Sequence, residues 1–165
     1  TRLAESIPGD LLIGLLDRLF QGMDDLVVSF KGTKIKTIGD AYMAVFGAPI
    51  EYEDHAVMGV RMGMALLKMV DSFSRQNDQG LQIRVGIHTG RVMAGVVGKE
   101  RMQFDVFGDD VNIASRFESS GAVGMVNVSH ETYISACDFF EFEERGEIAL
   151  KNKANMKAYF VVRER

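Results

Sequence analysis

The chain of 165 residues has one cysteine, two prolines and no tryptophan. Cys137 alone cannot form a disulfide within the chain, and no spacing of cysteine and histidine is typical of a zinc site. No apolar run approaches the roughly 20 residues of a membrane-spanning helix, and the first residues do not resemble a signal peptide. We therefore expect a soluble piece from a reducing, cytoplasmic setting, either free or as the cytoplasmic part of a membrane-anchored protein.

Positive charge is also in deficit, because 19 Lys and Arg stand against 23 Asp and Glu, which gives a net charge of -4. A protein that binds the phosphate backbone of DNA or RNA usually carries a basic surface. A ferredoxin-like RNA-binding domain would also show an aromatic RNP-type pair on a strand, and the sequence has none. We expect no nucleic-acid partner, although net charge leaves a local phosphate site open.

With 47% apolar and 25% charged residues, the sequence is typical of one globular domain over 1–165. Apolar spacing and turn signals give the expected elements. The expected helices are 8–30, 53–73, 111–118 and a short one begun by Ser129. The expected strands are 34–38, 41–46, 81–88, 104–107, 126–128, 148–150 and 158–162, with a sharp bend in 90–98. This order predicts an α+β sandwich of one sheet with helices on one face.

Lys36 and Asp40 lie in the first informative segment: Lys36 is on the strand that leads into the turn, and Asp40 is at or beside the tip of the expected hairpin. A carboxylate at such a tip can bind a hard cation such as Mg²⁺, which prefers oxygen ligands and often shares them with substrate phosphates. An aspartate in a turn is also common for conformational reasons alone. The segment by itself therefore leaves a metal site and an ordinary turn both open.

Asn112 and Arg116 are four residues apart on an expected helix, so they share a face, and Asp105 lies on the strand that leads into it. An amide, a guanidinium and a carboxylate at a strand-to-helix turn suit a nucleotide, since arginine binds phosphoryl groups well. In the alternative interpretation, Arg116 pairs with a nearby acid, and Asp109 or Asp110 caps the helix.

Three motifs occur together and in order: KTIGDAY at 36–42, GIHTG at 86–90 and DVFGDDVNIASR at 105–116. Together with 145–147 and 151–160 they closely resemble the catalytic domain of class III nucleotidyl cyclases over nearly the whole chain. The resemblance implies a ferredoxin-like βαββαβ core with extra C-terminal strands. It also implies a head-to-tail homodimer whose two active sites lie across the interface.

The same resemblance implies a role for each site residue. Asp40 would be one of two metal-binding aspartates, with two Mg²⁺ or Mn²⁺ ions per site. The residues contributed by the partner subunit would be Lys36, Asp105, Asn112, Arg116 and Lys151. Lys36 and Asp105 would read the purine, Asn112 would orient the ribose, Arg116 would neutralise charge on the α-phosphoryl group, and Lys151 would hold the outer phosphates.

The implied reaction converts ATP to 3′,5′-cyclic AMP and pyrophosphate, and the alternatives are a guanylyl cyclase or a catalytically silent module for dimerisation or nucleotide binding. Residues 1–6 resemble the sequence just after the family's first strand, which carries the other metal aspartate. We therefore expect this segment alone to be nearly inactive and its neighbouring strands to have unpaired edges. Sensory or regulatory domains are expected elsewhere in the full-length protein. Asn152 and Ala154 depart from the family's glycines around Lys151.

Overall fold

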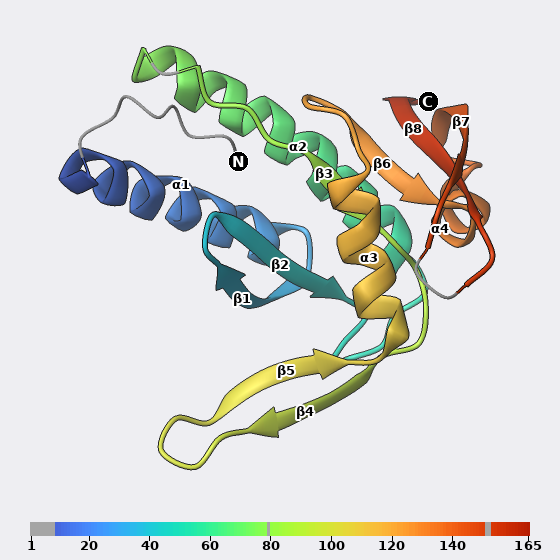
Figure 1. Ribbon diagram of the computed structural model, residues 1–165, viewed down its shortest axis with the longest axis horizontal. Coiled ribbons are helices and arrows are strands. Elements are labelled where there is room, and N and C mark those ends of the chain that lie inside the picture. The colour runs from blue at the N-terminus through green and yellow to red at the C-terminus, as the bar shows by residue number, and fades with distance from the viewer. Residues whose placement is uncertain (1–8, 79, 151–152) are drawn as a thin grey trace.

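The computed structural model describes residues 9–78, 80–150 and 153–165 (Figure 1). Its helices are α1 Gly9–Ser29, α2 His55–Gln76, α3 Asp109–Ser119 and α4 His130–Ala136. Its strands are β1 Gly32–Ile38, β2 Ala41–Phe46, β3 Val85–Ile87, β4 Met93–Val97, β5 Gln103–Phe107, β6 Val126–Ser129, β7 Phe140–Ile148 and β8 Met156–Glu164. The expected α+β class is confirmed.

The strands form three hydrogen-bonded groups rather than the one sheet expected. Four strands make a sheet in the order β3-β6-β8-β7, in which β3 runs parallel to β6 and the other pairs are antiparallel. The β1-β2 and β4-β5 pairs are separate antiparallel hairpins. Within the described ranges β2 pairs only with β1, and β3 pairs only with β6, so each has one open edge.

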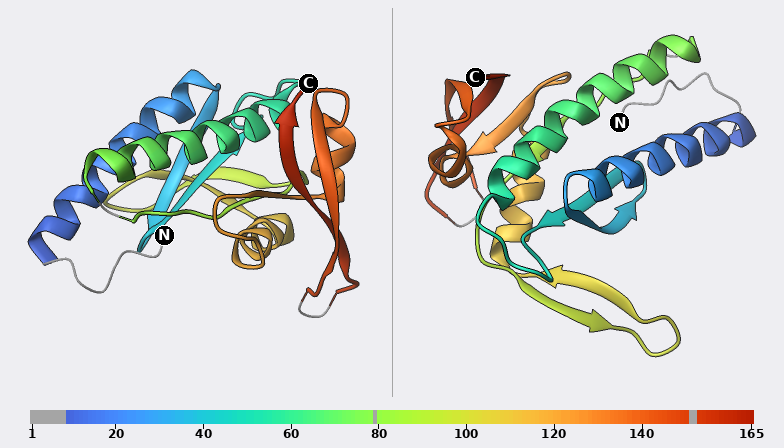
Figure 2. Two further views of the ribbon diagram at one scale, coloured as in Figure 1. Left: turned by 90° about the horizontal axis from the view of Figure 1, so that it is seen from above. Right: turned by 180° about the vertical axis from the view of Figure 1, so that it is seen from behind.

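Helix α1 packs its apolar stripe against α2, and the two long helices lie next to each other in Figure 1 and in the right view of Figure 2. The buried members of the stripe recur three or four residues apart, which is the period of a helix with one face in the core. They are Leu15, Leu19, Met23 and Val27. Val70 of α2 and the extended residues Leu81 and Ile83 complete much of this cluster.

The first hairpin is tied to α1 by Asp24. Its carboxylate accepts a hydrogen bond of 2.7 Å from the Tyr42 hydroxyl and one of 2.9 Å from the Lys34 ammonium. Burial, followed by the hydrogen bond to Asp24, raises the pKa of the Tyr42 phenol. The phenol therefore stays protonated and keeps donating to Asp24 at neutral pH.

The other face of α2 contributes to a second core over the four-stranded sheet. Val60 of α2, Val128 of β6 and Phe140 of β7 are fully buried there, and α4 closes the cluster with Ala136. Helix α3 packs separately, through Ile113 and Phe117, against Ile148 and Ala158. The polar side of α3 is left facing outward.

Three expected strand boundaries were wrong. Only 85–87 of the expected strand 81–88 forms a strand, although Leu81 and Ile83 are buried and the Ile83 carbonyl accepts a hydrogen bond from the Gly124 amide at 2.9 Å. The glycine-rich segment 90–98 contains strand β4 rather than only a bend. The strand expected at 148–150 is β7, which ends at Ile148, and its charged, largely exposed middle hid the alternation that periodicity needs.

Among the helices in the described ranges, none combines the length and the apolarity that crossing a lipid bilayer requires.

Candidate functional site

Lys36 and Asp105 are brought together from β1 and β5. The Lys36 ammonium donates to a carboxylate oxygen of Asp105 at 2.9 Å, and the other oxygen accepts from the Val106 amide at 2.8 Å. The Gln103 side chain links the same strands by donating to the Ile35 carbonyl at 3.1 Å. The bond from Lys36, followed by that from Val106, holds the pKa of Asp105 below its ordinary value. The pair fixes a cationic donor beside an anionic acceptor.

Asp40 lies at the tip of the β1-β2 hairpin, as expected from its turn. The pairing of Ile38 with Ala41 closes a two-residue turn, in which Gly39 has φ 60, a left-handed conformation that glycine adopts without strain. Asp40 is exposed. Asp40 is thus placed at the surface by a two-residue turn.

Asp40 suits a hard divalent cation in kind but does not complete a site. Carboxylate oxygens are the ligands that Mg²⁺ and Mn²⁺ favour, and Mg²⁺ often takes one or two carboxylates together with substrate phosphates. In the described part of the chain, no group of three or more His, Cys, Asp or Glu side chains could hold a metal ion. Asp40 therefore fits a shared site in which further oxygens come from elsewhere.

Asn112 and Arg116 are both exposed on α3, one helical turn apart, while Ile113 and Phe117 face the core. Arg116 donates through Nε to the carbonyl of Ala149 at 3.3 Å. The described residues give Arg116 no ion pair, so the alternative in which it neutralises a nearby acid was wrong. Its guanidinium has five N–H donors in all, of which this bond uses one.

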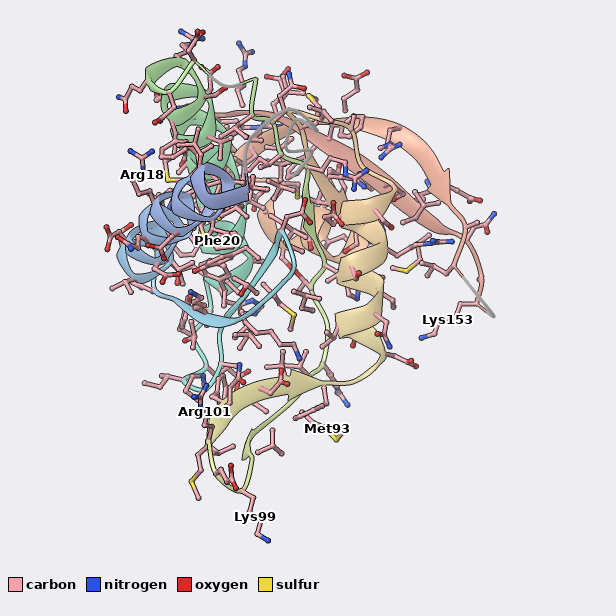
Figure 3. The ribbon with its side chains drawn as sticks, turned by 60° about the vertical axis from the view of Figure 1, so that its left-hand side comes forward. Arg18, Phe20, Met93, Lys99, Arg101 and Lys153 are labelled. Atoms are coloured by element: carbon pink, nitrogen blue, oxygen red, sulfur yellow. The ribbon has the colours of Figure 1, made fainter. Side chains whose placement is uncertain are left out.

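Lys151 lies outside the described residues, but both flanks of it contact α3. Ala149 accepts the bond from Arg116 near one end of the helix, and Lys153 forms an ion pair of 3.0 Å with Asp109 at the other end. Figure 3 labels Lys153 beside the lower end of this helix, where the helix begins. The connection between β7 and β8 is therefore anchored on α3 on each side of Lys151.

The expected carboxylate cap of α3 was wrong. Its N-cap residue is Gly108, at φ 127, and no side chain caps the helix there. The Asp110 carboxylate instead contacts His88 Nε2 at 3.0 Å and accepts from the Arg91 amide at 2.7 Å. Burial raises the pKa of Asp110, but these two bonds, together with charge interactions with His88 and Lys153, lower it more, so it lies below its ordinary value. Sequence spacing gave no signal for this contact across 22 residues.

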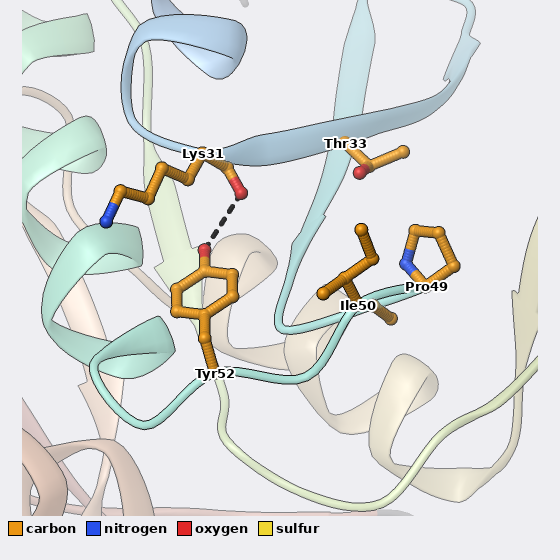
Figure 4. A pocket seen from close by; sticks show the side chains of 6 residues that line it. Lys31, Thr33, Pro49, Ile50 and Tyr52 are labelled. Carbon is orange, nitrogen blue, oxygen red and sulfur yellow. Dashed lines mark hydrogen bonds between the residues drawn. The ribbon is translucent and has the colours of Figure 1, made fainter.

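A separate surface hollow of about 270 Å³ lies where the start of β1 meets the loop after β2 (Figure 4). Tyr52 forms one wall and donates its hydroxyl proton to the Lys31 carbonyl at 2.9 Å. Its lining residues are Lys31, Thr33, Ala48, Pro49, Ile50 and Tyr52. None of the nucleotide-site candidates lines this hollow.

Comparison with known proteins shows the family of the chain. Residues 1–163 match the adenylate and guanylate cyclase catalytic domain. The chain is 37% identical over 161 residues to an adenylate cyclase of Mycobacterium tuberculosis, covering 98% of this chain and 36% of the relative. The adenylyl cyclase CyaB from P. aeruginosa has a TM-score of 0.92 and 33% identity, with 98% of this chain and 87% of that chain covered.

The guanylate cyclase domain of RhGC from Catenaria anguillulae, solved in complex with GTP, also has a TM-score of 0.92. It is 30% identical, with 98% of this chain and 89% of that chain covered. The chain therefore belongs to the adenylate and guanylate cyclase catalytic domain family, and the resemblance of its motifs is confirmed. It spans 36% of the length of the mycobacterial relative. Its relatives include proteins named adenylate cyclase and proteins named guanylyl cyclase.

Proposed function

We propose that the chain is the catalytic domain of an adenylyl cyclase, which converts ATP to 3′,5′-cyclic AMP and pyrophosphate at sites shared between two copies of the chain. The single observation that carries the choice of ATP is the pair of Lys36 and Asp105 at 2.9 Å. This pair places a hydrogen-bond donor next to a hydrogen-bond acceptor.

Adenine and guanine present opposite patterns to such a pair. Adenine has an acceptor at N1 and a donor at N6, so an ammonium at N1 and a carboxylate at N6 are both satisfied. Guanine, bound in the same position, places N1–H against the ammonium and O6 against the carboxylate. Each polar group would then lose water without gaining a partner, which costs affinity in a partly buried pocket. The arrangement therefore favours ATP over GTP.

The proposed reaction is a displacement within one nucleotide. The ribose 3′-hydroxyl gives its proton to solvent water, and its oxygen bonds to the α-phosphorus. The bond from that phosphorus to the bridging oxygen breaks, and pyrophosphate leaves with the electron pair of that bond. Arg116 would neutralise charge that builds up on the α-phosphoryl oxygens, and Asn112 would orient the ribose. Lys151, whose flanks are anchored on α3, would hold the outer phosphates.

Asp40 would supply one oxygen ligand for Mg²⁺ or Mn²⁺ at this site. When bound, such ions neutralise charge on the attacking and leaving oxygens. The tip of the hairpin presents the Asp40 carboxylate, whereas Lys36, four residues earlier, pairs across to β5. In the proposed head-to-tail dimer, Asp40 of one copy therefore serves the site that contains Lys36, Asn112 and Arg116 of the other.

The β4-β5 hairpin supports a homodimer. It projects from the rest of the fold in Figure 1, and each of its strands pairs only with the other in the described part of the chain. A lone two-stranded hairpin is marginally stable in water, yet this one exposes large apolar side chains at Met93, Val96, Val97, Met102 and Phe107. A second copy of the chain would cover them.

An activity assay on the full-length protein tests the proposal. With Mg²⁺ or Mn²⁺ present, we expect cyclic AMP from ATP, and a kcat/KM for ATP at least about tenfold above that for GTP. The cyclic nucleotide can be separated by chromatography, and its amount can be compared with the amount of pyrophosphate released. A preference for GTP would assign a guanylyl cyclase, and nucleotide binding without either cyclic product would assign a silent module; both results would overturn the proposal.

A further inference from the structure

A buried chain of polar contacts runs through His88, just after β3. The ring is 3% exposed and stacks on Phe117, with ring centroids 6.2 Å apart and planes 6° from parallel. Its Nδ1 lies 2.8 Å from the Ser129 hydroxyl, and its Nε2 lies 3.0 Å from the Asp110 carboxylate. The tautomer protonated at Nε2 satisfies both, since Nε2 then donates to Asp110 and Nδ1 accepts from Ser129.

On one side the chain of contacts is fixed by α4. Ser129 is fully buried and caps that helix by accepting from the Thr132 amide at 3.3 Å. The Thr132 hydroxyl also lies 2.9 Å from the hydroxyl of Thr89, the neighbour of His88. Glu131 of α4 is the nearest further charge to the ring, with an oxygen 3.7 Å from Nδ1. These contacts on the α4 side therefore fix the position of the His88 ring.

On the other side, this series of polar contacts ends at the first turn of α3. One Asp110 oxygen contacts His88, and the other accepts from the Arg91 amide at 2.7 Å. A Cβ on Gly90 would overlap the Asp110 carboxyl group, so the loop approaches this closely only because residue 90 is glycine. Since α3 has no side-chain cap, His88 and this loop are what hold Asp110.

The opposite end of α3 is held by the same sheet. A Cβ on Gly86 would overlap the backbone of Phe117 and Glu118, and the buried Asn127 amide donates to the Phe117 carbonyl at 2.7 Å. Asn112 and Arg116 lie between these two anchors. Because α3 is held at both ends, the orientation of its outer face depends on β3, β6 and the contact of His88 with Asp110, in addition to the packing of its buried face against Ile148 and Ala158.

We propose that His88 and Asp110 are positioning residues for the cyclase reaction, holding the start of α3 so that Asn112 and Arg116 meet the ribose and the α-phosphoryl group. The inference rests on the proposed function. His88 is buried, so it acts through α3 rather than by touching the nucleotide. A displacement of about 1 Å in a group that stabilises the transition state can lower a rate about 100-fold, which makes kcat the sensitive quantity.

Two amide variants of His88 separate its two contacts. In His88→Gln the amide nitrogen reaches the place of Nε2 and can still donate to Asp110, whereas in His88→Asn it reaches only the Ser129 side. In the full-length protein we expect His88→Gln to keep kcat within about threefold, and His88→Asn and Asp110→Ala to lower it about 10- to 100-fold with KM changed little. Hydrogen exchange of the 109–119 amides should quicken in His88→Asn and Asp110→Ala only.

His130→Gln is the matched control, because His130 begins α4 next to Ser129 but contacts Tyr159, at 3.1 Å, instead of α3. We expect its kcat to stay within about twofold of the parent. Equal kcat in the Gln and Asn variants of His88, whether retained or lost, would overturn the inference. If the parent itself forms no cyclic nucleotide, the proposed function fails instead. Unchanged exchange in α3 of His88→Asn would then overturn the positioning role independently.

Discussion

At the residue scale, the contact between Lys36 and Asp105 joins β1 to β5 across 69 positions of sequence. The ammonium lies on β1 of the first hairpin, and the carboxylate lies on β5 of the second. Neither hairpin alone could present both groups to one base. In the proposed adenylyl cyclase, substrate choice would therefore depend on how the two hairpins meet, and a charge change at either residue is a direct test.

Lys36→Glu should abolish most ATP turnover, because the pair would become two carboxylates that repel each other and cannot donate to adenine N1. We expect kcat/KM for ATP to fall at least about tenfold, measured as cyclic AMP formed by the full-length protein. Lys34→Glu is the control, since Lys34 lies on the same strand but pairs with Asp24. An ATP rate within about twofold of the parent in Lys36→Glu would contradict the base-recognition argument.

The pKa of Asp105 predicts an acid-sensitive contribution to stability. It is lower in the folded chain than its ordinary 3.8 because Lys36 and the Val106 amide stabilise the carboxylate. The unfolded chain therefore binds more protons as the pH falls below about 4, so this contribution is present at neutral pH and is lost through the acid range. Urea unfolding at several pH values should show a shallower acid loss for Asp105→Asn. An identical slope in both proteins would contradict the assignment.

At the scale of elements, the position of helix α3 depends on the close approach of its last turn to β3. Residue 86 is glycine, and any Cβ there would enter the backbone of Phe117 and Glu118. The last turn of α3 thus approaches β3 more closely than a side chain would allow. This close approach fixes the last turn of α3 against β3, and with it the position of the face that carries Asn112 and Arg116.

Gly86→Ala should therefore destabilise the fold by about 1–3 kcal/mol, the usual cost of forcing extra volume into a packed site. The measurement is the free energy of unfolding from urea titration. Gly95→Ala is a matched control, because Gly95 lies on β4, where a Cβ would meet nothing within 4 Å. Equal stabilities for the two variants would show that α3 can move away from β3 freely.

At the scale of the whole molecule, the proposed active site requires two chains, and a mixing experiment tests this. Asp40→Asn and Arg116→Ala should each be inactive as homodimers. In a head-to-tail mixed dimer one site carries both changes and the other carries neither. An equal mixture, allowed to exchange subunits, should recover about one quarter of the parent activity. If the mixture stays inactive although mixed dimers form, each site is built within one chain.

The apolar β4-β5 hairpin should supply much of the dimer contact. Met93 and Val96 are 70% and 62% exposed, so replacing both by lysine places two charges where an apolar partner surface is expected. We predict that Met93→Lys/Val96→Lys is monomeric by light scattering and loses activity in parallel, while remaining folded. Ile134→Lys, on the exposed side of α4, should stay dimeric. A dimeric double variant would show that the hairpin is not the interface.

Local patterns in the sequence were enough to predict the α+β class, both long helices, the first hairpin with Asp40 at its tip, and the pairing of Asn112 and Arg116 on one face. Periodicity and turn chemistry act over a few residues, so such features can be read directly from the chain. The three motifs, which occur together and in order, also predicted the protein family. The role of each site residue, the metal and the choice of base stay predictions.

Only the tertiary structure decided which distant groups meet. The Lys36 ammonium contacts Asp105, and Ala149 and Lys153 contact side chains of α3. The Asp110 carboxylate contacts His88, although a helix cap was expected there. The tertiary structure also revealed β4 and the long β7, whose exposed residues show no periodic pattern. Such contacts depend on the packing of whole elements, and neither the spacing nor the type of nearby residues encodes that packing.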